Sequence, residues 1–258
     1  MSTGKKFRLG RLIKNGKMFC IPLDHGVTHG PIGHLNDIDF AIKAVLDGGG
    51  SSIVLHKGIT KSVQIPKDLG LIIHISASTI LSTDYNRKTI VTSVEEVLAL
   101  GADGVSIHIN IGSKYEHEML RDLGIIAKEC DRFSLPLMAM TYVRPTIDGE
   151  IKNPAIIAHA ARVASELGAD IVKVSYPGNS EAVNQVVSSC TQPIVIAGGE
   201  CTPSIEEALK IAEQSMKGGA LGISFGRNVF QRQNMLQMVK SLSSIVYDGL
   251  TLTAGSSY

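Results

Sequence analysis

The sequence contains no tryptophan, and aromatic residues make up only 5% of its 258 residues. It therefore has few of the rings on which nucleic-acid bases or sugars stack in binding sites. It also has no excess charge, because 25 Lys and Arg residues face 24 Asp and Glu residues. A chain without a strong charge of either sign has little electrostatic attraction for a polyanion. We therefore expect no nucleic-acid partner.

Long apolar runs are missing as well. No stretch approaches the roughly 18 consecutive apolar residues that are typical of a membrane-spanning helix. The basic N-terminal segment MSTGKKFRLGRLIKNGK has no apolar core of a signal peptide. The cysteines form no CxxC pair, which favours reduced thiols; they are Cys20, Cys130, Cys190 and Cys201. We therefore expect a cytoplasmic protein without a membrane partner.

What the sequence does contain is a repeated unit, in which a helix-like segment ends in glycine and a short apolar run follows. The unit occurs at residues 46–56, 98–109, 164–176 and 216–226. Glycine is favoured just past a helix end because it adopts the left-handed conformation without a steric penalty. Helix starts are marked too, since Ser93 and Ser204 each begin an S-x-x-E capping box and Asn153 precedes Pro154. Helices and strands are thus predicted to alternate.

Eight apolar runs predict eight strands, at residues 19–24, 52–56, 71–75, 104–109, 136–142, 171–176, 193–197 and 220–225. Alternation with helices makes the strands parallel, and eight of them in this length predict an α/β protein of the (β/α)8 TIM-barrel class. Residues 56–70 look like a loop rather than a full helix. No linker divides the chain, so we predict a single domain over residues 1–258 with a short C-terminal tail. A doubly wound open sheet fits the alternation but explains the number of strands less well.

Polar residues at the strand ends indicate a site, because the active site of such a barrel lies at the C-terminal ends of its strands. The first predicted strand ends at Asp24. Strand alternation directs Phe19, Ile21 and Leu23 toward the helices and Asp24 toward the barrel mouth. The fifth predicted strand ends at Tyr142, so we expect an acid and a phenol at one mouth.

Lys173 lies in the middle of the apolar strand Ile-Val-Lys-Val. Alternation directs Lys173 and Ser175 to one face and Val172 and Val174 to the other. Burial disfavours the charged ammonium and lowers the pKa of a lysine, and a neutral amine is a nucleophile toward carbonyls. The alternative is a structural ion pair between Lys173 and Asp24.

The last two predicted strands end in Gly198-Gly199 and Gly226-Arg227. Glycines let backbone N–H groups approach an anion, and barrels often bind phosphate at this position. Arg227 can add a charge-assisted contact. We interpret these residues as a phosphate site rather than as turn glycines only.

The three features together predict aldol chemistry on a phosphorylated, sugar-like ketone. Lys173 would form a Schiff base with the ketone, and Asp24 would act as the general base. Tyr142 would be a second proton carrier. The resulting imine would make the neighbouring carbon an enamine nucleophile.

Other polar residues admit more than one interpretation. His25, His29 and His34 have i, i+4, i+9 spacing on a loop without further ligands, which disfavours a zinc aldolase. We therefore predict no metal and no cofactor, with His25 orienting Asp24. Lys57 follows the second strand and either meets a substrate carboxylate or lies at the rim. Three more histidines lie near strand ends, where they line the pocket or are satisfied in the core; they are His56, His74 and His108.

Several motifs resemble the archaeal-type class I aldolases. They are PLDHGVTHGPIGHL, VLHKGI, DLGLIIHISAST, VEEVLALGADGVSIHINIGS, AHAARVASELGADIVKVSY, IVIAGG and GISFGRNVFQ. The most similar branch is that of 2-amino-3,7-dideoxy-D-threo-hept-6-ulosonate synthase and related aldolases that condense aspartate semialdehyde. The resemblance implies a Schiff-base lysine at Lys173, a proton acceptor at Asp24, a proton donor at Tyr142, and a homo-oligomer, commonly a decamer. It implies donor-substrate contacts at Asp24, His25, Gly26, Val27, Thr28, Tyr142, Val143, Arg144, Gly198, Gly199, Gly226 and Arg227.

The sequence departs from this family at three places. Val143 follows the tyrosine where proline is usual, Ala77-Ser78 replace a glycine pair after the third strand, and Glu200-Cys201 follow Gly198-Gly199. The first two departures lie near the expected substrate site.

The resemblance implies an aldolase or transaldolase that joins L-aspartate 4-semialdehyde to a three-carbon unit. The unit would come from a phosphorylated ketose or dihydroxyacetone phosphate, and the product would be a seven-carbon amino-keto acid precursor of an aromatic compound. The alternatives are a fructose-1,6-bisphosphate aldolase of the same family, a phosphate-binding barrel isomerase without an imine, and a non-catalytic sugar-phosphate-binding protein.

Overall fold

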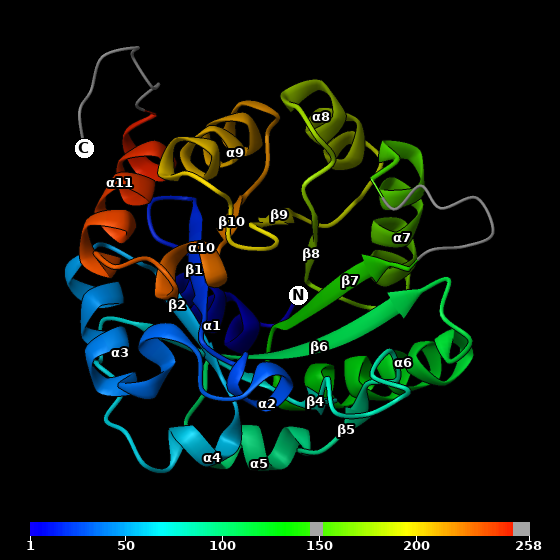
Figure 1. Ribbon diagram of the computed structural model, residues 1–258. Helices are drawn as coiled ribbons and strands as arrows, with labels where there is room; N and C mark the ends of the chain where they lie inside the picture. The colour runs from blue at the N-terminus through cyan, green and yellow to red at the C-terminus, as the bar shows by residue number, and fades with distance from the viewer. Residues whose placement is uncertain (145–151, 250–258) are drawn as a thin grey trace.

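The computed structural model describes residues 1–144 and 152–249 and contains a closed barrel of parallel strands (Figure 1). The strand order around the barrel is β1-β10-β9-β8-β7-β6-β3-β2. The barrel strands are β1 (Met18–Pro22), β2 (Ser52–Leu55), β3 (Gly70–His74), β6 (Gly104–Ile111), β7 (Leu137–Val143), β8 (Ile171–Ser175), β9 (Ile194–Ala197) and β10 (Gly222–Ser224). The predicted C-terminal tail, from residue 250 onward, lies outside the described residues.

Helices surround the barrel, and a small antiparallel pair of strands, β4 (Ser76–Ala77) and β5 (Thr89–Ile90), follows β3 (Figure 1). The helices are α1 (Thr3–Leu12), α2 (Gly26–His29), η1 (Gly33–Asn36), α3 (Ile38–Asp47), α4 (Lys57–Thr60), α5 (Val94–Ala99), α6 (Glu116–Phe133), α7 (Pro154–Glu166), α8 (Ser180–Ser188), α9 (Ile205–Lys217), α10 (Arg227–Phe230) and α11 (Met235–Asp248). No helix in this part of the chain is both long and apolar enough to cross a membrane.

The predicted (β/α)8 barrel is confirmed. Each of the eight predicted strands is present, with ends shifted by no more than two residues. Pairing of β1 with both β2 and β10 closes the sheet and excludes the open-sheet alternative. Between β2 and β3 the only helix is the single turn α4, as the loop prediction for residues 56–70 implies.

The helix starts follow the predicted caps. Ser93 accepts a hydrogen bond from the Glu96 amide (3.1 Å), and the Glu96 carboxylate accepts one from the Ser93 amide (3.0 Å). Ser204 accepts from the Glu207 amide (3.2 Å), which is one half of the predicted box. Asn153 caps α7, whose first residue is Pro154.

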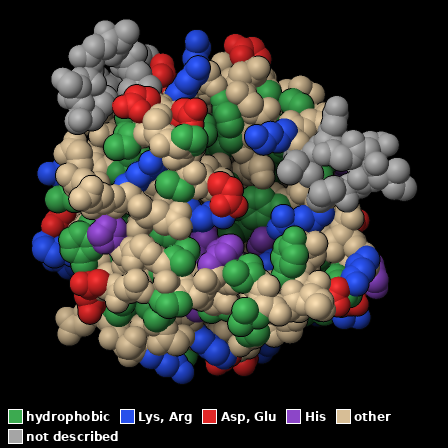
Figure 2. Space-filling view, in the orientation of Figure 1, with side chains coloured by type: hydrophobic (Ala, Val, Ile, Leu, Met, Phe, Trp, Pro, Cys, Tyr) green, Lys and Arg blue, Asp and Glu red, His purple; other side chains and the backbone are tan. Residues whose placement is uncertain are grey.

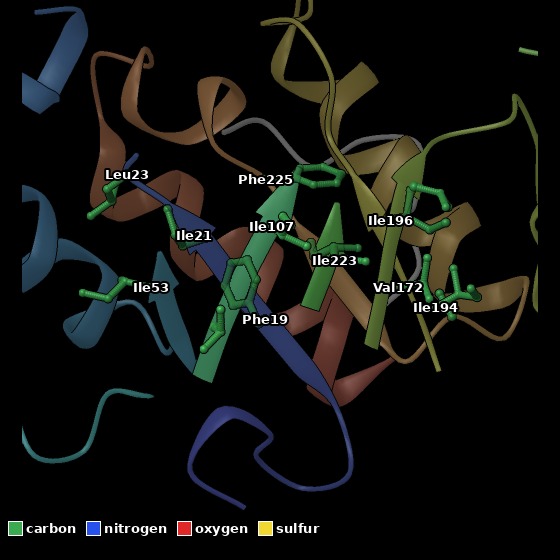
Figure 3. Packing of buried hydrophobic residues seen from close by; sticks show 14 of the residues in the cluster. Phe19, Ile21, Leu23, Ile53, Ile107, Val172, Ile194, Ile196, Ile223 and Phe225 are labelled. Atoms are coloured by element: carbon green, nitrogen blue, oxygen red, sulfur yellow. The ribbon is translucent and has the colours of Figure 1, made fainter. Parts of the chain in front are cut away.

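Strand alternation divides the buried side chains into two clusters. The outward cluster lies between barrel and helices and includes Phe19, Ile21, Leu23, Val172 and Ile223 (Figure 3). This confirms the predicted orientation of the first strand. The second cluster fills the barrel interior; its buried members are Leu12, Met18, Cys20, Val54, Ile72, Met138, Met140, Ile171 and Val195.

Helix α1 closes the barrel at the N-terminal ends of its strands. Leu12 belongs to the interior cluster, and the backbone of Arg11 lies against Gly70 at the start of β3. The ammonium of Lys5, only 4% exposed, forms ion pairs with Asp131 (2.6 Å) and Asp170 (2.7 Å). The opposite end of the barrel is therefore the one available for a site.

Candidate active site

Inward-facing side chains change from apolar to polar toward the C-terminal ends of the strands. There the barrel presents an acid, a lysine, a phenol and three imidazoles, namely Asp24, Lys173, Tyr142, His56, His74 and His108. Figure 2 shows a hollow near the middle of this face, with histidines beside it and basic side chains on either side. Polar groups with no role in packing the core thus converge at one mouth.

Lys173 lies on β8 between Met140 of β7 and Val195 of β9, and is 4% exposed. Its flanking residues Val172 and Val174 belong to the outward cluster, so the lysine faces the barrel interior as predicted. It is buried deeply enough that water does not screen its charge from its neighbours.

Asp24 follows β1 and carries a carboxylate that is 12% exposed. Burial alone raises the pKa of this carboxyl, but His25, His74 and Lys173 together hold it below its ordinary value. The Nδ1 atom of His25 lies 3.3 Å from the Asp24 Oδ1 atom. Asp24 is therefore ionised at neutral pH and able to accept a proton, and His25 has the predicted position beside it.

Burial keeps the histidines at the mouth neutral. It lowers the pKa of His74 to about 3, against the attraction of Asp24. The Nδ1 atom of His74 hydrogen-bonds Ser106 (2.8 Å), and its ring meets that of His56 edge-on at 5.3 Å. Burial also lowers the pKa of His108 and His56. These three imidazoles therefore add no positive charge to the mouth at neutral pH.

A second polar chain begins at Tyr142, whose ring lies 4.9 Å from that of His108. The Asn110 amide group donates to the backbone oxygen of Asn86 (2.7 Å), so its oxygen faces the other two partners. That oxygen accepts from His108 Nε2 (2.9 Å) and from Arg144 Nε (2.7 Å). His108 therefore carries its proton on Nε2, and Tyr142 and Arg144 are held on one side of the mouth.

Backbone and cation meet at the ends of β9 and β10, where phosphate binding is predicted. A side chain at Gly226 would lie 2.7 Å from the His25 ring, so only glycine allows the chain to pass this closely. Gly199 has a φ of +73° and borders open space. The Nε atom of Arg227 is buried and has no hydrogen-bond partner among the described residues. These features suit an anion.

Glu200 already supplies a carboxylate at this place. Its Oε1 atom lies 2.5 Å from Arg227 Nη1, and its side chain is 84% exposed. An exposed carboxylate is held weakly, so a phosphate can displace it. An anionic ligand at Arg227 would therefore have to compete with Glu200.

Replacing Glu200 by glutamine is expected to lower the Kd for inorganic phosphate, and the KM of a phosphorylated ketose, about 2- to 5-fold. The increase in phosphate affinity should be measurable at low ionic strength and smaller in high salt, because the competing interaction is electrostatic. Calorimetric titration with phosphate at two salt concentrations measures it. The exposed Glu95→Gln variant is the matched control, and weaker phosphate binding in Glu200→Gln would contradict competition.

Asn228, for which the sequence predicts no role, joins the two segments where phosphate binding is predicted. The side chain is fully buried, and its amide donates to the backbone oxygens of Gly198 (3.0 Å) and Glu200 (2.9 Å). Its oxygen accepts from the amide and hydroxyl of Thr202, both at 2.9 Å, and from Arg232 (3.2 Å). The loop after β9 is thereby fixed to the start of α10.

Substituting Asn228 with alanine should lower the free energy of unfolding by about 2–3 kcal/mol, because buried carbonyls and donors lose their partner. We also expect a higher KM for phosphorylated substrates, since the loop that approaches the phosphate loses its anchor. Urea unfolding and steady-state kinetics measure the two effects. Exposed Asn184→Ala is the control; equal stabilities of the two variants would contradict the anchoring role.

The remaining predicted residues divide into two groups. Gly26, Val27 and Thr28 form the turn α2 directly after Asp24, at the mouth; His25 precedes them. Val143 and Lys57 are not brought to it. The Val143 side chain packs against the outward cluster, because it alternates with Tyr142 on β7. The Lys57 ammonium pairs with Glu96 (3.0 Å), which favours the rim interpretation.

The three histidines with i, i+4, i+9 spacing make separate contacts. His34 Nε2 contacts the backbone oxygen of Arg232 (3.0 Å), and the rings of His25 and His29 stack with 6.3 Å between their centroids. Within residues 1–144 and 152–249, no three His, Cys, Asp or Glu side chains are grouped as metal ligands.

Sequence reasoning missed Lys88 and Asn110 as well as Asn228. Asn110 was open to detection, since Ser106, His108 and Asn110 alternate along one strand and must share its inward face. Lys88 lies directly before the short strand β5, and no periodic pattern in this segment predicts that its side chain is buried.

Comparison with known proteins identifies the family of this chain. Residues 18–232 match the model of the DeoC/LacD family aldolases. The chain is 43% identical over 249 residues to 2-amino-3,7-dideoxy-D-threo-hept-6-ulosonate synthase 1 of Archaeoglobus fulgidus, covering 96% of this chain and 92% of that protein. It is 38% identical over 253 residues to 2-amino-4,5-dihydroxy-6-oxo-7-(phosphonooxy)heptanoate synthase of Streptomyces griseus, covering 96% and 92%.

A solved structure agrees in fold. The chain superposes with a TM-score of 0.88 on an archaeal fructose-1,6-bisphosphate aldolase whose catalytic lysine is covalently bound to the carbinolamine intermediate of the substrate. The two are 31% identical, and the match covers 94% of this chain and 99% of that one. By its sequence and its barrel, the chain belongs to the DeoC/LacD family of aldolases.

Proposed function

We propose that this protein is a Schiff-base-forming aldolase or transaldolase that joins L-aspartate 4-semialdehyde to a three-carbon unit. The unit comes from a phosphorylated ketose or from dihydroxyacetone phosphate, and the product is a seven-carbon amino-keto acid. The observation that carries the proposal is Lys173, buried on β8 beside the ionised Asp24 and next to the anion site at β9 and β10. Names of two relatives, both synthases of seven-carbon amino-keto acids, support the choice of substrates.

In the first step the donor's phosphate binds Arg227 and the backbone around Gly199 and Gly226, which directs its ketone toward Lys173. The Lys173 amine attacks the carbonyl carbon, and the carbinolamine loses water to give a protonated imine. This cation withdraws electrons from the bond between the α and β carbons. The burial of Lys173 strengthens that effect, because nearby charges are poorly screened there.

Asp24 then removes the proton from the β-hydroxyl of the bound ketose, and the bond between the α and β carbons breaks. The electron pair of that bond forms the enamine on Lys173, and the β carbon leaves as an aldehyde. For dihydroxyacetone phosphate, transfer of an α proton to Asp24 gives the enamine directly. Tyr142 is the group that exchanges protons at the carbinolamine stage, with its ring beside neutral His108.

The enamine carbon finally attacks the aldehyde carbon of the acceptor. A new carbon–carbon bond forms, the aldehyde oxygen takes a proton from Asp24, and the protonated imine is restored. Water hydrolyses the imine, which releases the ketone product and the free amine of Lys173. Atoms and charges balance without a metal or cofactor in any step.

A second candidate is fructose-1,6-bisphosphate aldolase activity, which the match to the archaeal aldolase structure favours. Two assays separate the candidates. One measures release of glyceraldehyde 3-phosphate from fructose 1,6-bisphosphate, and the other measures condensation of L-aspartate 4-semialdehyde with each donor by mass spectrometry. A kcat/KM at least about tenfold higher in the condensation supports our proposal, and the reverse ratio replaces it by the second candidate. Homo-oligomerisation and a cytoplasmic location stay predictions.

A further inference from the structure

Lys88 is a second buried lysine at the mouth that the reaction described above does not use. It is 6% exposed and stands next to β5. In the β4–β5 pair Ala77 lies opposite Thr89, so Ser78 is opposite Lys88. The Lys88 ammonium donates a hydrogen bond to the Ser78 hydroxyl. The hairpin after β3 therefore carries a fixed cation to the barrel mouth.

This cation lacks the carboxylate partners that buried Lys5 has. Lys5 forms ion pairs with two aspartates. Within residues 1–144 and 152–249, no Asp or Glu forms an ion pair with Lys88, and the charge of Asp24 acts on Lys88 without a direct contact. A buried charge without a counter-ion is costly, so a bound anion would stabilise it.

Arg144 is a second cation of this kind on the same side. It is half-buried, donates to the neutral Asn110 oxygen (2.7 Å), and has no carboxylate partner among the described residues. Asn110 also bonds the backbone oxygen of Asn86, two residues before Lys88. One asparagine therefore links the segments that carry the two cations.

The strand order places the cationic pair, Lys88 and Arg144, at a distance around the barrel from the phosphate site. Around the closed barrel β10 lies opposite β6, and β9 lies opposite β3. The phosphate site is at the ends of β9 and β10. Lys88 follows β3, and Arg144 follows β7 while bonded to Asn110 of β6. Basic side chains accordingly appear on both sides of the hollow in Figure 2, and a substrate anchored at both ends would cross the mouth past Lys173 on β8.

We propose that Lys88, together with Arg144, binds the carboxylate of the acceptor aldehyde. This inference rests on the proposed function, in which the donor's phosphate occupies the opposite side. The ammonium and guanidinium would both donate charge-assisted hydrogen bonds to the carboxylate. The pair thus selects acceptors that carry an anion and holds their aldehyde carbon toward the enamine on Lys173.

The test is the acceptor preference of Lys88→Met. Condensation is measured with one phosphorylated donor and three acceptors: L-aspartate 4-semialdehyde, succinic semialdehyde and uncharged propanal. We expect the ratio of kcat/KM for either semialdehyde over propanal to fall about 10- to 100-fold, as for loss of a charged hydrogen bond. The donor's KM should change little. Lys88→Arg should keep most of the preference, and Lys43→Met, an exposed lysine on α3, should keep all of it.

The alternatives give different results. An equal loss of activity with all three acceptors would mean that Lys88 supports the mouth or the chemistry in general, and would overturn the inference. An unchanged ratio in Lys88→Met would overturn it too. If Lys88→Met does not fold, loss of the preference in the folded Lys88→Arg variant would count against it, because charge is retained there. Failure of the proposed function itself is seen separately, as the absence of a borohydride-trapped donor on Lys173 in the unchanged protein.

Discussion

Replacing Lys173 by methionine is expected to abolish turnover, with kcat reduced by about 10⁴-fold or more, since no imine can then form. Methionine keeps the length and apolar stem of the side chain, so the barrel interior stays packed. The same variant should lose the covalent adduct that the unchanged protein forms when a phosphorylated ketose is added with borohydride. Intact-mass spectrometry measures the adduct, and circular dichroism checks the fold.

The location of the adduct is as informative as its presence. Burial lowers the pKa of Lys88 to about 8, so Lys88 is partly neutral at mildly alkaline pH and is a competing nucleophile. Peptide mapping of the reduced adduct separates Lys173 from Lys88. We expect modification at Lys173 alone, because Lys173 lies on β8 beside β9, where phosphate binding is proposed, whereas Lys88 follows β3 on the opposite side of the barrel.

Two results would contradict the imine. If Lys173→Met kept its turnover, the lysine would be an ion-pair partner of Asp24 and the isomerase alternative would gain support. If the well-folded unchanged protein formed no adduct with any phosphorylated ketose, both aldolase candidates would fail together. A non-catalytic sugar-phosphate-binding protein would then remain as the explanation of the anion site.

Asp24→Asn is expected to lower kcat by about 10²- to 10⁴-fold while leaving imine formation possible. The amide keeps the shape of the carboxylate but cannot take a proton from the β-hydroxyl. Because the pKa of Asp24 lies below its ordinary value, the unchanged enzyme has its base available at any pH near neutrality. Borohydride trapping with the ketose should therefore still label Lys173 in the variant, even though carbon–carbon bond cleavage is slow.

The matched control is Asp39→Asn, because Asp39 is an exposed aspartate in the first turn of α3. It should keep both turnover and trapping. A turnover in Asp24→Asn within a few-fold of the unchanged protein would show that another group is the base, and His74 or Tyr142 would be examined next. Loss of trapping as well as turnover would instead mean that Asp24 is needed to form the imine.

Much of the barrel was predictable because local sequence patterns specify its helices and strands. Glycine after a helix, a capping serine and a short apolar run each act within a few residues, and the eight apolar runs leave few alternatives to a closed barrel. Alternation on single strands also predicted that Lys173 faces inward and that Phe19 and Ile21 face the helices. The same rule, applied to the fifth strand, shows why Val143 is turned away from Tyr142.

The sequence by itself thus determined the fold, the inward lysine, the acid after the first strand and the glycines that follow the last two strands. Only the tertiary structure decided which cations stay without a carboxylate. Lys57 and Lys88 look alike as sequence, yet Lys57 meets Glu96 at the rim and Lys88 is buried beside Ser78. Asn228 likewise gains its role from carbonyls about 30 residues earlier in the chain. Such contacts depend on how the barrel closes, because closure, and not local pattern, brings the ends of distant strands together.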